Sequence, residues 1–204
     1  MPTFIVGQTG TLTRKTEQVG KFNFHNAYEL SEMAKKYNVG LKEHNGDYMG
    51  DVDLLMHIPS NITATNVAPQ YGTEETRAYL NLAKVEAELK ENGLIEDTSN
   101  IYNVLLDKAI ESERWRKWMV GDQVNLTVDE IKADPKLSVE VLDIAGHYTF
   151  NEDEVKSEIE KLYKNLESQQ INGRRYVIDH IKRPIRDYSE CYNLKGVTSR
   201  IKTL

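Results

Sequence analysis

Three short runs rich in β-branched and aromatic residues, each pair separated by a helix-length segment, constrain the fold of this chain most. TFIVGQ (3–8), VGLKEH (39–44) and NITATNV (61–67) have the composition and length of strands. Segments 25–38 and 51–58, which lie between them, have the apolar spacing of helices. Because strands joined through helices pair in parallel, the pattern predicts an α/β fold with βαβ units.

The pattern changes after residue 72 to one helix after another. Four segments have helical periodicity: 73–93, 100–119, 151–166 and 174–192. Asn151 and Glu154 stand at capping-box spacing and predict the start of the third of these helices. The chain therefore reads as an α/β portion followed by an all-helical portion.

Three strands are too few for a closed parallel sheet. A barrel takes about eight strands, and an open parallel sheet leaves its edges uncovered. We therefore expect the chain to be the C-terminal part of a larger α/β protein. Either a partner supplies the missing strands, or the chain is a truncated product.

Composition excludes several classes of protein. The 26 basic and 32 acidic residues give a net charge of −6, which argues against a chain-wide field for nucleic acid or membranes. No apolar run approaches the ~20 residues of a membrane span, and the N-terminus does not resemble a signal peptide. Cys191 is the single cysteine, which excludes an internal disulfide and disfavours a thiolate zinc site. We expect a cytoplasmic protein.

Each predicted strand ends close to a polar side chain: Gln8, His44 and Asn66. Binding sites in parallel α/β sheets collect at these strand ends. An imidazole with amide or carboxylate oxygens suits a divalent metal such as zinc, which could polarise a sugar carbonyl. The alternative for His44 is an imidazole that simply hydrogen-bonds a neighbouring carbonyl, and for Gln8 and Asn66 a role in stabilising loops.

The loops behind the strand ends add groups that suit a phosphorylated sugar. Gly46 and Gly72 would let backbone N–H groups approach a phosphate, and the helix predicted to open at Thr73 offers its N-terminus to an anion. Asp47 and Tyr48 could move protons or bind hydroxyl groups. The alternative for this pair is an ordinary surface turn.

Three motifs in order, FIVGQTGT, LKEHNGDYM and NVAPQYGTEETRAYL, carry a family resemblance. They resemble the C-terminal half of the class II D-tagatose-bisphosphate aldolase non-catalytic (Z) subunits and the related sugar-phosphate 4-epimerases. The likeness continues through HYTFNEDEVKSEIEKLY and YVIDHIKRPIRDYSECYNLKG, so it covers nearly the whole chain.

The resemblance implies a fold and a division of the chain. Residues 1–93 would be the last βα units of a TIM (β/α)₈ barrel, and 94–204 a helical C-terminal extension that packs on the barrel. The earlier strands of the family, with their Asp-His pair and metal-shell glutamate, have no counterpart here. A chain that lacks half of the barrel is expected to have little activity alone.

The resemblance also implies site residues. In class II aldolases a histidine at the position of His44 binds the catalytic divalent metal, usually zinc. Gln8 stands where fructose-type aldolases have a further histidine, so it either ligates the metal or orients the substrate. The loop Asn45–Gly46–Asp47 occupies the phosphate-binding region, and Asn66 lies near the substrate-binding asparagine.

Three functions remain open on the sequence. The first is an enzyme component of sugar-phosphate metabolism, either a Z-type aldolase subunit or a ketose-phosphate 4-epimerase, with Asp47 and Tyr48 as catalytic groups. The second is a non-catalytic partner that stabilises the catalytic aldolase subunit. The third is a helical interaction module that binds through the basic segment 173–186.

Overall fold

The computed structural model describes residues 2–202, and in them the chain is a mixed α/β protein, mostly helical, with one small parallel sheet. The chain divides into two compact units, Met1–Gln70 with Arg183–Leu204, and Tyr71–Lys182. Among the described residues no helix is both long and apolar enough to cross a bilayer.

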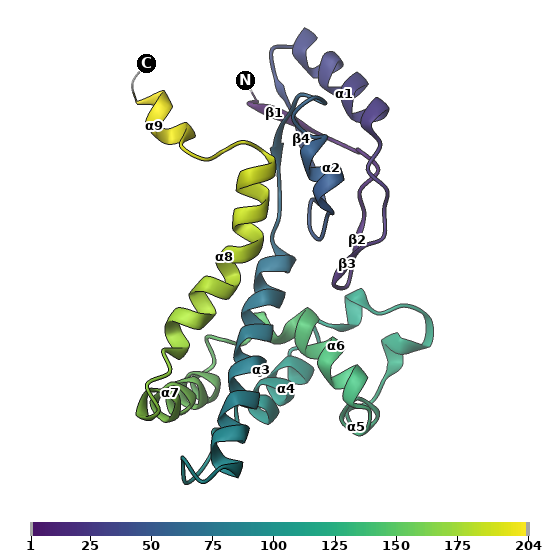
Figure 1. Cartoon of the computed structure of the whole chain (residues 1–204). Coiled ribbons are helices and arrows are strands. Elements are labelled where there is room, and N and C mark those ends of the chain that lie inside the picture. Colours follow the sequence, from purple (N-terminus) through teal and green to yellow (C-terminus); the bar gives the residue numbers. More distant parts are fainter. Residues whose placement is uncertain (1, 203–204) are drawn as a thin grey trace. The chain divides into compact units, whose positions relative to one another are not determined.

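The sheet of the first unit has the predicted parallel strands (Figure 1). It comprises β1 (Phe4–Gly7), β4 (Gly40–Glu43) and β5 (Ile62–Thr65) in the order β1-β4-β5, with β4 parallel to both neighbours. Helices α1 (Phe24–Lys36) and α2 (Asp51–Leu55) connect the strands. The prediction of βαβ units is confirmed, and the described residues form no closed barrel.

Helix α1 shows why its sequence is helical. Asn23 caps it by accepting a hydrogen bond from the Asn26 N–H at 3.0 Å. Ala27 and Ala34 are fully buried, and the helix packs on β1 and β4. The helix predicted over 25–38 ends at Lys36, and Tyr37, which follows it, is 68% exposed.

A short antiparallel hairpin precedes α1 and was not predicted. Its strands are β2 (Thr13–Arg14) and β3 (Glu17–Gln18), and Lys15 adopts a positive φ of 52° in the turn. Two-residue strands of polar side chains carry no alternating apolar signal, so sequence periodicity could not reveal them.

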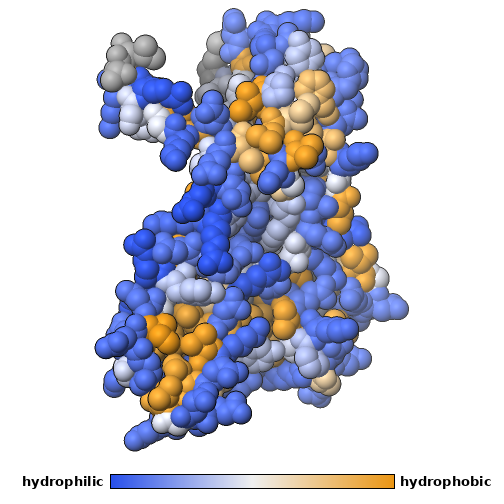
Figure 2. All heavy atoms as spheres, in the orientation of Figure 1, coloured by the Kyte–Doolittle hydropathy of each residue, from blue (hydrophilic) through white to orange (hydrophobic). Residues whose placement is uncertain are grey.

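The outer edge of the sheet exposes apolar side chains. Strand β1 pairs only with β4 among the described strands, and Phe4, Ile5 and Val6 are 40%, 40% and 60% exposed. Figure 2 shows hydrophobic residues gathered on the surface where the sheet and α2 lie. Parallel strands are usually covered, so this surface has the character of an interface.

The second unit is a set of helices around one apolar core. It contains most of α3 (Pro69–Glu91), the first part of α8 (Gly173–Cys191), and four helices between them: α4 (Ile101–Glu111), α5 (Val128–Ala133), α6 (Pro135–Ala145) and α7 (Asp153–Ser168). Three short 3₁₀ helices lie at Arg116–Trp118, Gly121–Asn125 and Gly146–Tyr148. In the first unit α8 is followed by the short helix α9 (Val197–Ile201).

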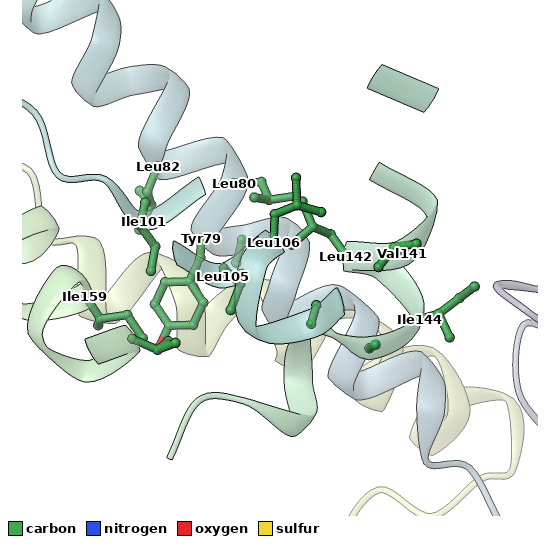
Figure 3. Packing of buried hydrophobic residues seen from close by; sticks show 14 of the residues in the cluster. Tyr79, Leu80, Leu82, Ile101, Leu105, Leu106, Val141, Leu142, Ile144 and Ile159 are labelled. Carbon is green, nitrogen blue, oxygen red and sulfur yellow. The ribbon is translucent and has the colours of Figure 1, made fainter. Parts of the chain in front are cut away.

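Large aliphatic side chains fill this core. Figure 3 shows Leu82 of α3 beside Ile101 of α4, and Leu106 of α4 beside Leu142 of α6; all four are at most 5% exposed. Trp115 is fully buried in the same core and donates its indole N–H to the Ile110 carbonyl at 3.2 Å.

Two predicted helix boundaries differ from the structure. The helix expected over 100–119 ends at Glu111, and the chain turns at Glu113, whose φ is +55°. Helix α7 begins after Glu152 without a side-chain cap, so the predicted capping box at its start is wrong. A complete capping box joins Thr127 and Glu130 at the start of α5 instead.

Candidate functional site

The segment His44–Tyr48, which we call the strand-end loop, follows β4 and is held by hydrogen bonds to its backbone. Four successive carbonyl groups of the loop accept side-chain donors. Thr11 donates to the His44 carbonyl at 2.7 Å, and Tyr188 to the Gly46 carbonyl at 2.8 Å. The Gln18 amide donates to the carbonyls of Asn45 and Asp47, at 2.9 and 3.0 Å. The loop is therefore ordered by two segments distant in sequence, Thr11–Gln18 and the part of α8 that contains Tyr188.

The Asp47 carboxylate caps helix α3. It is 2% exposed and accepts the N–H groups of Ala68 and Gln70 at 2.9 and 3.0 Å. The prediction that this helix opens at Thr73 is wrong, because it begins at Pro69. Its N-terminus, which we expected to be available to a bound anion, is thus already capped by a carboxylate of the chain itself.

Burial raises the pKa of Asp47, and the backbone N–H groups of Gln70 and Ala68 and the nearby His44 act in the opposite direction. This balance shows that the carboxyl lies in a desolvated setting and that His44 lies within electrostatic reach of it.

Two residues of the loop have left-handed backbone conformations. Asn45 has φ of 61° and Tyr48 has φ of 58°. Asparagine tolerates this region, whereas for tyrosine it costs of order 1 kcal/mol. A hydrogen bond offsets part of this conformational cost, because the Tyr48 N–H donates to the Gln70 side-chain oxygen at 2.8 Å. Strain retained in this way is frequent at functional sites.

The structure leaves two of the predicted ligand-binding side chains free. His44 is exposed, and within residues 2–202 neither its imidazole nor the Asn45 carboxamide has a hydrogen-bond partner. Gln8 is exposed as well and donates to the Thr11 carbonyl at 3.2 Å. Thr11 thereby links the predicted ligands Gln8 and His44 through its own backbone and hydroxyl groups.

Gly46 and Asn66 are brought into direct contact. The Gly46 N–H donates to the Asn66 carbonyl at 3.2 Å, so this N–H is already used. A side chain at Gly46 would meet the Thr65 hydroxyl at 2.3 Å, which explains the glycine without a ligand. The side-chain oxygen of Asn66 is buried and has no partner in the described part of the chain.

A metal would not find a complete set of ligands here. Zinc sites use three or four protein ligands, and residues 2–202 hold no group of three or more histidine, cysteine or acidic residues that could bind a metal ion. His44 can supply one ligand, so the residues present do not by themselves fit the zinc site that the sequence predicts.

Sequence reasoning missed a buried pair beneath the strand-end loop. Glu43 is fully buried, and its carboxyl is hydrogen-bonded to Nε2 of His57, which is 3% exposed. Thr9 and Thr65 also donate to this carboxyl, at 2.6 and 3.2 Å. Nδ1 of His57 donates to the Asp53 carbonyl at 2.8 Å. Both ring nitrogens are thus engaged, which makes the pair a structural support of the loop. The one sequence signal for this pair was the position of Glu43 in a predicted strand, where a buried carboxyl needs a polar partner.

The comparisons with known proteins bear on the fold. No protein-family model and no curated protein matches the chain. Among solved structures, a probable tagatose 6-phosphate kinase from Sinorhizobium meliloti 1021 is similar, with a TM-score of 0.70 and 14% sequence identity. The match covers 92% of this chain and 52% of that one, so the chain spans about half the length of that protein. At this identity the likeness shows a shared fold.

Proposed function

We propose that this chain is a component of a sugar-phosphate enzyme of the class II tagatose-bisphosphate aldolase type, as a Z-type subunit or a ketose-phosphate 4-epimerase. The observation that carries the proposal is the ordered strand-end loop, which holds its backbone rigidly and leaves His44 and Asn45 free. The fold shared with a protein described as a probable tagatose 6-phosphate kinase supports a place in carbohydrate metabolism.

The proposed roles follow the position of each group. His44 is a ligand of a divalent metal, zinc by the chemistry of imidazole, and Gln8 either ligates the same ion or orients the substrate. Asn45 and Asn66 contact the phosphorylated sugar, while Gly46, whose N–H and carbonyl are both hydrogen-bonded within the chain, shapes the loop. Asp47 and Tyr48 are the proposed proton-transfer groups. Since the described residues offer too few metal ligands, the remaining ligands come from a second polypeptide.

The exposed edge of the sheet supports such a partner. Strand β1 presents Ile5 and Val6 to solvent, and a further parallel strand beside it would cover them. In this proposal residues 1–93 are the last βα units of a (β/α)₈ barrel, and 94–204 form its helical extension. The second polypeptide is the missing N-terminal half or the catalytic aldolase subunit.

The same edge favours one alternative function. A chain with an apolar sheet edge and an incomplete set of metal ligands could serve as a non-catalytic partner that stabilises the catalytic aldolase subunit. In that case the exposed edge is the functional surface, and His44 has no part in turnover.

Cleavage of D-tagatose 1,6-bisphosphate by the catalytic aldolase subunit, with zinc and with this chain added, tests both functions. If the chain is an enzyme component, His44→Ala should reduce the increase in cleavage rate that the chain gives at least about tenfold. Even mutation of a residue that hydrogen-bonds a metal ligand typically costs 10–100-fold in metal affinity or activity. The matched control is His25→Ala, because His25 is an exposed histidine on α1.

The outcomes separate the two functions. An increase in rate or in enzyme half-life that His44→Ala leaves unchanged would favour the non-catalytic partner. Wild-type chain that changes neither quantity would contradict both functions.

A further inference from the structure

Gln18 of β3 joins the hairpin to the strand-end loop with both ends of its amide. Its Oε1 accepts the N–H groups of Leu12 and Gly20, at 2.5 and 3.2 Å. Its Nε2 donates to the carbonyls of Asn45 and Asp47. Two N–H donors face one end and two carbonyl acceptors face the other, which fixes the orientation of the amide.

The two carbonyl groups that Gln18 binds flank Gly46 in the loop. Asn45 has a positive φ, and the next such residue is Tyr48, so the bonds from Gln18 hold the part of the loop that begins and ends close to left-handed residues. Among the described residues no other side chain donates to two carbonyls of this loop. The direction of the Asn45 and His44 side chains depends on the backbone that these bonds hold.

We propose that Gln18 is a positioning residue for the strand-end loop: its Nε2 holds the carbonyls of Asn45 and Asp47 and thereby directs the free side chains of His44 and Asn45 toward the ligand. This inference rests on the proposed function, because it assigns the ordered loop to the binding of a sugar phosphate. Holding groups in their binding geometry before the ligand arrives reduces the entropy lost on binding.

The hairpin therefore contributes to the site without touching the ligand. Its two short strands have little apolar surface, and Thr11 and Thr13 on the same segment also approach loop carbonyls, at 2.7 Å for His44 and 3.5 Å for Asn45. The segment from Thr11 to Gln18 thus supplies three side chains that donate hydrogen bonds to the carbonyls of the loop.

The variant Gln18→Glu separates the two roles of this side chain. Glutamate has the same shape and keeps an acceptor for Leu12 and Gly20, but it has no N–H to donate to the loop. The control is Ser60→Ala in the same unit, which removes a buried hydroxyl that donates to the Met56 carbonyl at 2.6 Å and leaves the loop untouched.

Two measurements on the full chain test the inference. Amide hydrogen exchange at Gly46 and Tyr48 should become about tenfold faster in Gln18→Glu, as expected for the loss of two hydrogen bonds. The dissociation constant for D-tagatose 1,6-bisphosphate, with zinc and the catalytic aldolase subunit present, should rise about tenfold, in line with the lost preorganisation. Ser60→Ala should change neither, even where it lowers the melting temperature equally.

The outcomes distinguish the positioning role from the proposed function. Unchanged loop exchange in Gln18→Glu, or faster exchange with unchanged affinity, would overturn the positioning role alone. An equal loss of affinity in Ser60→Ala would overturn it too, because the effect would then be one of general stability. Wild-type chain that adds no binding of the ketose bisphosphate to that of the catalytic aldolase subunit would overturn the proposed function, and this inference with it.

Discussion

Replacing His57 with alanine is expected to lower the free energy of unfolding by about 3–5 kcal/mol, because it leaves the buried Glu43 carboxyl without this hydrogen-bond partner and opens a cavity. Glu43 is fully buried, and His57 lies between the rings of Phe22 and Tyr192, with ring centroids 4.8 and 4.9 Å away. Alanine would remove both the hydrogen-bond partner of the carboxyl and the ring that fills this space. Urea denaturation of the variant and the wild-type chain measures the difference.

Two controls identify the cause of that loss. His25→Ala removes an exposed histidine, 3.2 Å from Glu29, and should cost under about 0.5 kcal/mol. Adding Glu43→Leu to His57→Ala removes the buried carboxyl that has lost its partner, and it should restore part of the stability. A His57→Ala variant no less stable than His25→Ala would show that the buried pair does not support the loop.

Asp47→Ala is expected to cost about 2 kcal/mol, because it removes the cap of α3 and leaves the N–H groups of Ala68 and Gln70 without their acceptor. Asp47→Asn keeps an oxygen that can accept both and should be far less destabilising. Equal losses in the two variants, measured by denaturation at pH 7, would contradict the capping role.

The stability of the wild-type chain relative to Asp47→Asn should depend on pH. Burial raises the pKa of Asp47 above its ordinary 3.8, so the folded chain holds this proton more tightly than the unfolded chain does. The stability that comes from holding this proton more tightly in the folded chain is therefore complete below pH 3.8. It is lost as the pH rises through the raised pKa. The stability of the wild-type chain relative to Asp47→Asn should therefore fall as the pH rises from 3 to 7. A constant difference from pH 3 to pH 7 would contradict it.

The three strands of the sheet could be predicted because β-branched runs alternate with helical spacing. Their registers could not, and the register of β4 with β5 shifts between Leu41 and Lys42. The start of α3 could not be predicted either. Its first turn follows Pro69 and is stabilised by Asp47, a residue 21 positions before Ala68, so no local pattern marks it.

The sequence pointed to the strand-end loop as a site, and the structure shows how that loop is ordered. The donors that hold it could not be predicted, because Gln18 lies in a hairpin of two-residue strands and Tyr188 is 142 residues from Gly46. Glu43 and His57 were missed for the same reason, since a pair 14 residues apart follows neither helical nor strand spacing. Such long-range polar contacts arise from packing, which single-sequence patterns do not report.

The most direct test of the proposed sugar-phosphate site is an NMR titration of the ¹⁵N-labelled chain, bound to unlabelled catalytic aldolase subunit, with D-tagatose 1,6-bisphosphate and zinc. The proposal predicts saturable shifts of the amide signals of Asn45–Tyr48, which are lost in His44→Ala and absent with unphosphorylated tagatose. Saturable shifts confined to other residues, or equal shifts in the wild-type chain and His44→Ala, would contradict the assignment of the strand-end loop as a sugar-phosphate site.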